Sequence, residues 1–220
     1  MKRLAFMLYT EVMELSPEAF RRLDESPDPE FYREPRFVTH IDEEAIAAVT
    51  QLYREWLPPG GTILDLMSSW ISHLPPEVPY RSVVGLGLNA QELAANPRLD
   101  EFLVHDLNAQ PVLPLEDARF DAACICVSID YLTDPVAIIR DIGRVVVPGA
   151  PLVITFSNRC FPTKAVAIWH QLSGAGQQKL VEHYFNEAGN WHPITRTTPI
   201  PEDGSGDPLF AVIGRRRDTS

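Results

Sequence analysis

Short apolar runs alternate with amphipathic stretches along most of the chain. Five of the runs are rich in apolar and β-branched residues and are bounded by proline, glycine or polar residues, which is typical of buried parallel strands. They cover residues 62–66, 82–88, 102–106, 120–127 and 151–157. Stretches with a helical spacing of apolar residues lie between most of them. Strands that alternate with helices in this way predict an α/β fold with a mostly parallel sheet.

Polar capping residues mark the starts of the predicted helices. Asp42 precedes a helix with acidic residues in its first turn, and Asp134 followed by Pro135 opens another. Asn89 caps a third helix, with Glu92 in the capping-box position three residues further on. Further helical segments are predicted at 16–23, 165–169 and 177–188.

The two ends of the chain differ in character. Residues 191–198 and 209–214 are strand-like and flank a turn-rich segment, which predicts an antiparallel hairpin at the sheet edge. Prolines make residues 1–40 irregular, and the last ten of these residues are both aromatic and cationic. They form either an arm packed on the domain or a lid over its cleft. We therefore divide the chain into an N-terminal arm, 1–40, and one domain, 41–220.

Composition limits the class of partner. The chain has 220 residues and a formal net charge of −11, which opposes binding to nucleic acid or to an anionic membrane. The three cysteines, Cys124, Cys126 and Cys160, are too few for a disulfide framework, and no residues show metal-ligand spacing, so no metal is expected. Residues 1–9 only imitate a signal peptide, because acidic residues follow without a cleavage site. We expect a soluble protein of the reducing cytoplasm.

The most informative stretch is residues 61–73, around the first predicted strand. Asp65 lies near the C-terminal end of that strand, where open α/β sheets bind their ligands. Ser68 or Ser69 can cap a short helix that ends before Pro75, and a free helix N-terminus attracts anions. The stretch therefore predicts an anion cradle.

Four segments follow one another in a characteristic order. They are Ile63 to Leu66, Val83 to Gly85, residues 113–121, and the stretch from Asp134-Pro135 to Arg-Val-Val-Val-Pro-Gly149. In this order they resemble the class I S-adenosylmethionine-dependent methyltransferases, especially the branch that acts on small molecules. The last segment is the most specific match. The resemblance implies a Rossmann-like fold with a seven-stranded, mostly parallel sheet and an antiparallel C-terminal strand.

The cofactor motifs of that family are altered in this chain. The family has glycines after the first strand, in a G-x-G-x-G pattern, where this chain has Met67, Ser69 and Ile71. Glycine lets the backbone approach a ligand closely, so these side chains would crowd the cofactor unless the loop takes a different path. The acidic residue that accepts the ribose hydroxyls is replaced by Gly87, with Asn89 as a partial substitute.

The resemblance also implies roles for residues at the strand ends. Asp65 would lie near the methionine end of S-adenosylmethionine, and Asp106 would meet the adenine amino group; either carboxylate is alternatively a helix-cap partner. If the acceptor is a hydroxyl or an acidic carbon, a general base helps, and the candidates by position are His40, His73 and Tyr131. The residues expected to bind the cofactor are Asp65, Ser68, Ser69, Trp70, Gly85, Gly87, Asn89, Asp106, Leu107 and Ser128.

Two functions remain open at this point. The first is an active methyltransferase for a small organic molecule, with a remodelled cofactor loop. The second is a catalytically degenerate relative that binds a metabolite or a protein partner. Residues 128–131 lack the motif of enzymes that methylate planar nitrogens, such as those of DNA adenine. A homodimer is compatible with either function.

Overall fold

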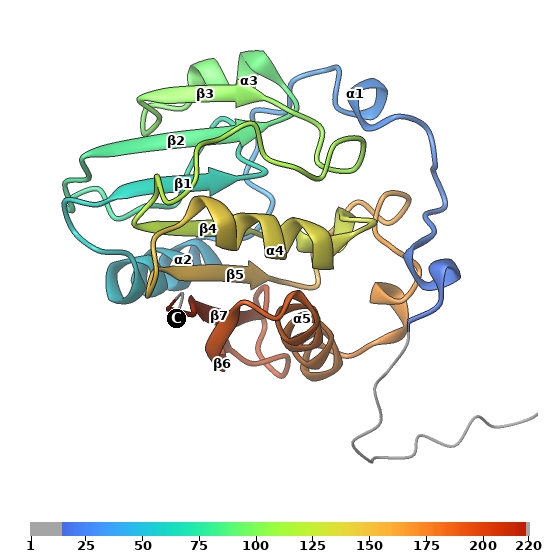
Figure 1. The fold of residues 1–220 in the computed structure, drawn as a ribbon. Coiled ribbons are helices and arrows are strands. Elements are labelled where there is room, and N and C mark those ends of the chain that lie inside the picture. Colours follow the sequence, from blue (N-terminus) through green and yellow to red (C-terminus); the bar gives the residue numbers. More distant parts are fainter. Residues whose placement is uncertain (1–14, 219–220) are drawn as a thin grey trace, which may run out of the picture.

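The computed structural model describes residues 15–218, so the stretch weighed as a signal peptide lies outside the described residues. The described part of the chain contains one seven-stranded sheet in the order β3-β2-β1-β4-β5-β7-β6 (Figure 1). The strands β1 to β5 run parallel, and β7 is antiparallel to its neighbours β5 and β6. This confirms the predicted fold class and the C-terminal hairpin. The strands are β1 Thr62–Leu66, β2 Ser82–Gly87, β3 Glu101–Val104, β4 Ala122–Cys126, β5 Pro151–Phe156, β6 Trp191–Ile200 and β7 Leu209–Arg216.

The strand order reverses between β1 and β4. β1 pairs with β2 on one side and with β4 on the other, so Asp65 lies between Gly85 and Cys124 in the sheet. The crevice beyond the C-terminal ends of two strands that diverge in this way is the usual ligand site of an open α/β sheet. The topology therefore places the end of β1 at the centre of any binding site.

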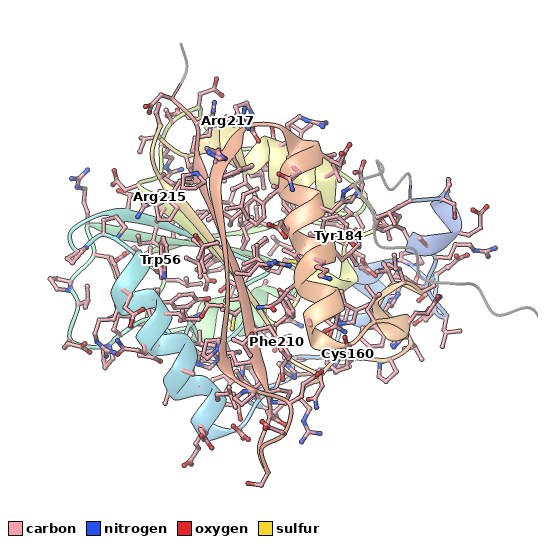
Figure 2. All side chains as sticks on the ribbon, turned by 90° about the horizontal axis from the view of Figure 1, so that it is seen from below. Trp56, Cys160, Tyr184, Phe210, Arg215 and Arg217 are labelled. Carbon is pink, nitrogen blue, oxygen red and sulfur yellow. The ribbon has the colours of Figure 1, made fainter. Side chains whose placement is uncertain are left out.

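Helices cover both faces of the sheet. Alternate side chains of each strand point to opposite faces, so Ile63 packs with the core under α2 whereas Leu64 packs with the core under α4 and α5. Seen from below, α2 with Trp56 and α5 with Tyr184 lie on opposite sides of the β6–β7 hairpin (Figure 2). No helix in the described part of the chain has the length and apolarity needed to cross a membrane. The helices are α1 Asp28–Phe31, α2 Glu43–Trp56, α3 Ala90–Ala95, α4 Pro135–Val145 and α5 Gly174–Ala188.

The predicted caps of three helices are formed. The Asp42 carboxylate accepts a bond from the backbone amide of Ala45 at the start of α2, and Asp134 accepts one at the start of α4. The Asn89 side chain accepts bonds from the amides of Gln91 and Glu92 at the start of α3. Each cap satisfies amides that lack a partner within the helix.

Several predicted elements differ from the structure. No helix follows β1: residues 67–81 are irregular, because side chains rather than a helix satisfy the polar groups of this loop. The segment 165–169 is not helical; only the short 3-10 helix Trp169–Gln171 begins at its end. The helix predicted at 16–23 is reduced to a 3-10 turn, Pro17–Phe20. Short turns replace helices here because too few consecutive residues are free to form the backbone ladder.

The described part of the N-terminal arm is built into the domain. Its backbone bonds to the segment after β5: the amide of Asp24 donates to the carbonyl oxygen of Thr163 (2.8 Å), and the amide of Ala167 donates to that of Arg21 (2.8 Å). Figure 1 shows the arm passing along the C-terminal ends of the strands before it enters α2. The arm therefore lies at the ligand-binding end of the sheet.

A buried ion pair fixes this part of the arm. Lys164 has no exposed side-chain surface, and its Nζ lies 3.2 Å from Oδ1 of Asp28 and 2.6 Å from the carbonyl oxygen of Ser26. Nη1 of Arg22 lies 2.7 Å from the same carboxylate oxygen of Asp28. Burial alone raises the pKa of Asp28, but the bonds from Arg22 and Asn108 outweigh it and hold this pKa below its usual range.

We expect Asp28→Ala to destabilise the fold by about 3–5 kcal/mol, because it removes the nearer acidic partner of the buried Lys164 and leaves only the half-exposed Asp24, at 3.6 Å, as a counter-charge. Glu25→Ala is the matched control on the same arm, since the Arg21–Glu25 pair is exposed and such pairs contribute roughly 0–1 kcal/mol. Urea unfolding followed by circular dichroism measures both. Equal, small losses for the two variants would show that the arm is not anchored by Asp28.

Candidate functional site

A cavity of about 290 Å³ lies at the C-terminal ends of β1, β2 and β4, beneath the arm. This volume is near the lower end of the range for small-molecule sites, roughly 300–1,000 Å³. Twelve of the residues predicted from the sequence to form the site line it; they are His40, Asp65, Ser68, Ser69, Trp70, His73, Gly87, Asn89, Asp106, Leu107, Ser128 and Tyr131. The structure therefore brings predicted residues from five separate chain segments to one place.

Gly85 is the one predicted site residue that does not line the cavity. It lies in the middle of β2, where a methyl group would come within 2.4 Å of Cδ1 of Leu99. Its small size serves the packing of the α3–β3 connection against the sheet. The prediction that Gly85 contacts a cofactor therefore finds no support in the cavity, which begins two residues later at the end of β2.

The Asp65 carboxylate organises the loop after β1. Its Oδ2 accepts hydrogen bonds from the hydroxyls of Ser68 (2.6 Å) and Ser72 (2.5 Å). Among the described residues, Oδ1 has a single partner, the thiol of Cys124, at 3.6 Å. Burial raises the pKa of Asp65, while the serine hydroxyls and the thiol act in the opposite direction. A buried carboxylate needs such donors, so it bends the loop around itself.

A second polar residue supports this loop from α3. Nδ2 of Asn96 donates to the carbonyl oxygen of Ser69 (2.8 Å) and to the hydroxyl of Ser72 (2.9 Å). These bonds replace the backbone bonds that a helix would have made. The expected helix N-terminus at Ser68 or Ser69 is therefore absent, and with it the anion cradle that depended on it.

The packing of the loop after β1 explains why position 87 is a glycine. A methyl group at this position would lie 2.2 Å from the carbonyl oxygen of Ser68, and the amide of Ser68 donates to the carbonyl oxygen of Leu86 (2.8 Å). The loop after β1 thus folds directly over the end of β2. A side chain at position 87 therefore has no room beside the backbone of Ser68.

The backbone is strained at the two strand ends that face the cavity. Met67 follows β1 with φ of 54°, and Val127 follows β4 with φ of 43°. For a β-branched residue such as Val127 this left-handed conformation is an outlier, and such strain concentrates at functional sites. Both residues line the cavity.

The arm occupies the polar groups of α3 that face the cavity. Nδ2 of Asn89 donates to the carbonyl oxygens of Tyr32 (2.9 Å) and Arg33 (3.1 Å). Oε1 of Glu92 accepts the backbone amide of Arg36 (2.6 Å), and its Oε2 accepts the Ser69 hydroxyl (2.6 Å). Glu92 therefore does not act as the reciprocal half of a capping box. It joins the arm to the loop after β1, a role that the sequence pattern did not indicate.

The far wall of the cavity contains Asp106. Its Oδ1 accepts the backbone amides of Asn108 (3.0 Å) and Ala109 (3.2 Å), so it caps the turn after β3. None of the hydrogen bonds formed by residues 15–218 reaches Oδ2. One oxygen of this carboxylate is therefore structural and the other is free for a ligand.

The candidate bases lie on the arm side of the cavity. Loss of hydration lowers the pKa of His40 and of His73, and the charge of Arg36 lowers that of His40 further, although Glu92 opposes it. Both rings are therefore mostly neutral at pH 7 and able to accept a proton. The hydroxyl of Tyr131 accepts a hydrogen bond from the amide of Phe161 (2.9 Å). Burial raises the pKa of Tyr131, so the phenol stays protonated at neutral pH and does not act as a base. Among residues 15–218 no cluster of three or more side chains is arranged to bind a metal ion.

Comparisons with known proteins agree with this architecture. Residues 69–154 match a family model described as a methyltransferase domain. A search of curated proteins gives no match. The match and the fold are both in agreement with the predicted resemblance to the class I S-adenosylmethionine-dependent methyltransferases.

Solved structures share the fold at low sequence identity. A complex between the Haloferax volcanii Trm112 methyltransferase activator and a methyltransferase matches with a TM-score of 0.61 and 14% identity, over 80% of this chain and 92% of that one. Haemonchus contortus phosphoethanolamine N-methyltransferase 2, in complex with S-adenosyl-L-methionine, matches with a TM-score of 0.57 and 14% identity. The match covers 78% of this chain and 52% of that one. An S-adenosylmethionine-dependent methyltransferase from Aquifex aeolicus matches with a TM-score of 0.57 and 16% identity, over 87% of this chain and 100% of that one.

We expect Gly87→Ala to displace the loop after β1 and to destabilise the protein by about 1–3 kcal/mol, the usual cost of overpacking. Gly204→Ala is the control, because a methyl group there would lie 3.8 Å from its nearest neighbour and should change stability by less than about 0.5 kcal/mol. Thermal unfolding measures the stability, and hydrogen exchange of residues 67–73 measures the loop. Wild-type stability and wild-type exchange in the Gly87 variant would contradict the close contact with Ser68.

Proposed function

We propose that this chain is an S-adenosylmethionine-dependent methyltransferase that acts on a small organic molecule. The observation that carries the proposal is the cavity between Asp65 and Asp106 at the point where the strand order of a methyltransferase fold reverses. The net charge of −11 supports a small-molecule acceptor over nucleic acid. The same charge and the sparse cysteines are in keeping with a cytoplasmic protein.

The residues at the two ends of the cavity suit the two ends of the cofactor. At one end, the free Oδ2 of Asp106 can accept the adenine amino group, with Leu107 beside it. At the other, Oδ1 of Asp65 has only a thiol partner and can receive the ammonium of the methionine part. The ribose has no acidic partner, because the backbone of Ser68 lies against Gly87. We therefore expect affinity in the micromolar range or weaker.

Methyl transfer needs little covalent chemistry from the protein. The cofactor, when bound, supplies a methyl group on a reactive sulfonium, and the protein has to place the acceptor in line with it. His40 and His73, with their lowered pKa values, can take the proton of a hydroxyl or an acidic carbon. The aromatic wall formed by Tyr131 and Phe161 can exclude water from the acceptor.

We further propose that the arm is a lid. Tyr32, Arg33 and Arg36 bond through their backbones to Asn89 and Glu92, and Asn89 follows Gly87 by two residues, at the end of β2 where a ribose would need partners. Further along, Nε1 of Trp70 donates to the carbonyl oxygen of Val38 (3.0 Å). A ligand that takes over these groups has to displace residues 32–38, so the lid opens to admit it and closes on the complex.

One observation favours the alternative function. The contact between Gly87 and Ser68 removes the family's usual ribose contact, and the arm occupies the partial substitute, Asn89. A catalytically degenerate relative that binds a metabolite or a protein partner would have no need of that contact. Cofactor binding separates the two functions.

Calorimetric titration with S-adenosylmethionine and S-adenosylhomocysteine tests the proposal. We expect saturable binding with a dissociation constant in the micromolar range or weaker, and about tenfold or greater weakening in Asp106→Ala, because a hydrogen bond to a charged group contributes roughly 1.5–3 kcal/mol. Asp117→Ala is the control, since this carboxylate is exposed and pairs with Arg144 on the surface. Quenching of Trp70 fluorescence should follow the same curve and be lost in Trp70→Phe. Absence of saturable binding up to millimolar cofactor would refute the methyltransferase and favour the degenerate relative.

The lid has its own test. Trp70→Phe removes the bond to Val38 while an aromatic ring remains beside Phe37, so we expect faster hydrogen exchange of residues 36–39 and a cofactor association rate raised about two- to tenfold, as loss of one hydrogen bond allows. Trp56→Phe is the control, because Trp56 lies on α2 beneath Arg215 and away from the cavity. Unchanged exchange and association in Trp70→Phe would mean that the arm is a fixed wall.

A further inference from the structure

The arm side of the cavity contains a cationic group without a counter-charge. Nη1 of Arg36 is buried, and no hydrogen-bond partner reaches it from residues 15–218. The Ser128 hydroxyl oxygen is in the same state, and both residues line the cavity. A buried donor without a partner costs roughly 1–3 kcal/mol, and more when it is charged. A site that keeps such donors is completed when a ligand binds to them.

The carboxylates that line the same side of the cavity are already occupied. Asp28 is bonded by Arg22, Asn108 and Lys164. Both oxygens of Glu92 have donors, from the backbone of Arg36 and from Ser69. None of these acids is directed at the guanidinium of Arg36. Among the unpartnered groups of residues 15–218 that line the cavity, Arg36 carries a positive charge and the hydroxyls of Ser128 and Tyr53 can donate, so together they favour an anion over a cation.

Aromatic rings hold the guanidinium in place. Its central carbon lies 4.7 Å from the ring centre of Phe31, 5.5 Å from that of Tyr32 and 5.2 Å from that of Phe161. Nη2 donates to the carbonyl oxygen of Phe31 (2.9 Å). Contacts with ring faces stabilise an arginine without consuming its hydrogen-bond donors. They leave Nη1 preorganised for a ligand.

The same rings offer a surface for the body of the ligand. Phe161 lies 5.9 Å from Tyr131, centre to centre, and His40 lies 5.4 Å from Phe161. A planar apolar group in this part of the cavity would meet aromatic side chains, and a carboxylate attached to it would meet Arg36. Two donors, one of them singly charged, match the two oxygens and single charge of a carboxylate.

We propose that the methyl acceptor is an aromatic carboxylate whose carboxylate group is bound by Nη1 of Arg36 and the hydroxyl of Ser128. This rests on the proposed methyltransferase function and specifies its acceptor class. Arg36 is then a specificity-determining residue, carried by the lid itself, so the lid brings the anion receptor to the acceptor when it closes.

Benzoate and its uncharged isostere benzamide are the probes. Ligand-observed NMR titrations of the full-length protein, with and without saturating S-adenosylhomocysteine, give both dissociation constants. We expect wild-type protein to prefer benzoate by about tenfold or more, the size of one charge-assisted hydrogen bond. Arg36→Met should abolish the preference and Arg36→Lys should retain part of it. Arg33→Met is the matched control, because Arg33 is exposed on the same arm, and it should keep the wild-type preference.

Several results would overturn the proposal. The wild-type measurement needs no variant. If wild-type protein binds benzoate and benzamide equally, or does not bind benzoate, the proposal is refuted even if Arg36→Met fails to fold. An undiminished preference in Arg36→Met does the same. If Arg36→Met weakens S-adenosylhomocysteine but not 5′-methylthioadenosine, which lacks the amino-acid part, then Arg36 holds the carboxylate of the cofactor and the acceptor assignment is wrong.

The two proposals fail separately. Benzoate binding that depends on Arg36, in a protein that does not bind S-adenosylhomocysteine, would refute the methyltransferase and leave an anion site in a metabolite-binding relative. Cofactor binding without a preference for benzoate would leave the methyltransferase intact and refute the carboxylate acceptor.

Discussion

The buried carboxylate of Asp65 is the constraint from which the rest of the site follows. It lies at the end of the central strand β1, where its solvation is replaced by the hydroxyls of Ser68 and Ser72. Those two bonds require the chain to turn back over the sheet instead of starting a helix. The resulting loop covers the end of β2, and Gly87 is the residue that leaves room for it. The buried carboxylate of Asp65 and the lack of a side chain at Gly87 therefore belong to the same local arrangement of the loop.

The arm depends on this loop in turn. Glu92 bonds to Ser69 in the loop and to the backbone of Arg36 in the arm, and Trp70 bonds to Val38. The loop therefore forms the floor to which the arm is attached. The earlier part of the arm is held more firmly, by the ion pairs of Asp28 with Arg22 and Lys164. This division, with a firm anchor followed by a segment attached through a few backbone bonds, is what a hinged lid requires.

The fold and the site carry different amounts of functional information. The sheet order and the segment that matches a methyltransferase domain show the fold, but a shared fold does not determine a reaction. In the proposed function, the ribose lacks the family's usual acidic partner, whereas Asp65 and Asp106 lie at the two ends of the cofactor. Nη1 of Arg36 and the hydroxyl of Ser128 are among the buried polar groups of residues 15–218 that line the cavity without a partner, and we assign both to the acceptor. The chemistry of those groups, rather than the fold, is what gives information about the acceptor.

The sequence by itself determined the elements whose signals are local. The apolar runs of β1, β2, β4 and β5, the hairpin β6–β7 and the caps at Asp42, Asn89 and Asp134 are all readable within a few residues, because burial period and capping depend on near neighbours. It also located the strand ends where the cavity lies, since parallel strands end at a common edge.

Only the tertiary structure decided how the loop and the arm meet at that edge. Ser68 and Ser69 look like helix caps in sequence, but their hydroxyls bond to Asp65 and to Glu92, which lies 23 residues from Ser69. Glu92 looks like half of a capping box, yet its carboxylate binds an amide 56 residues away. Gly85 and Gly87 are alike in sequence, but one packs against Leu99 and the other beneath Ser68. Partners so distant along the chain leave no local pattern, because they are set by which segments the folded sheet brings together.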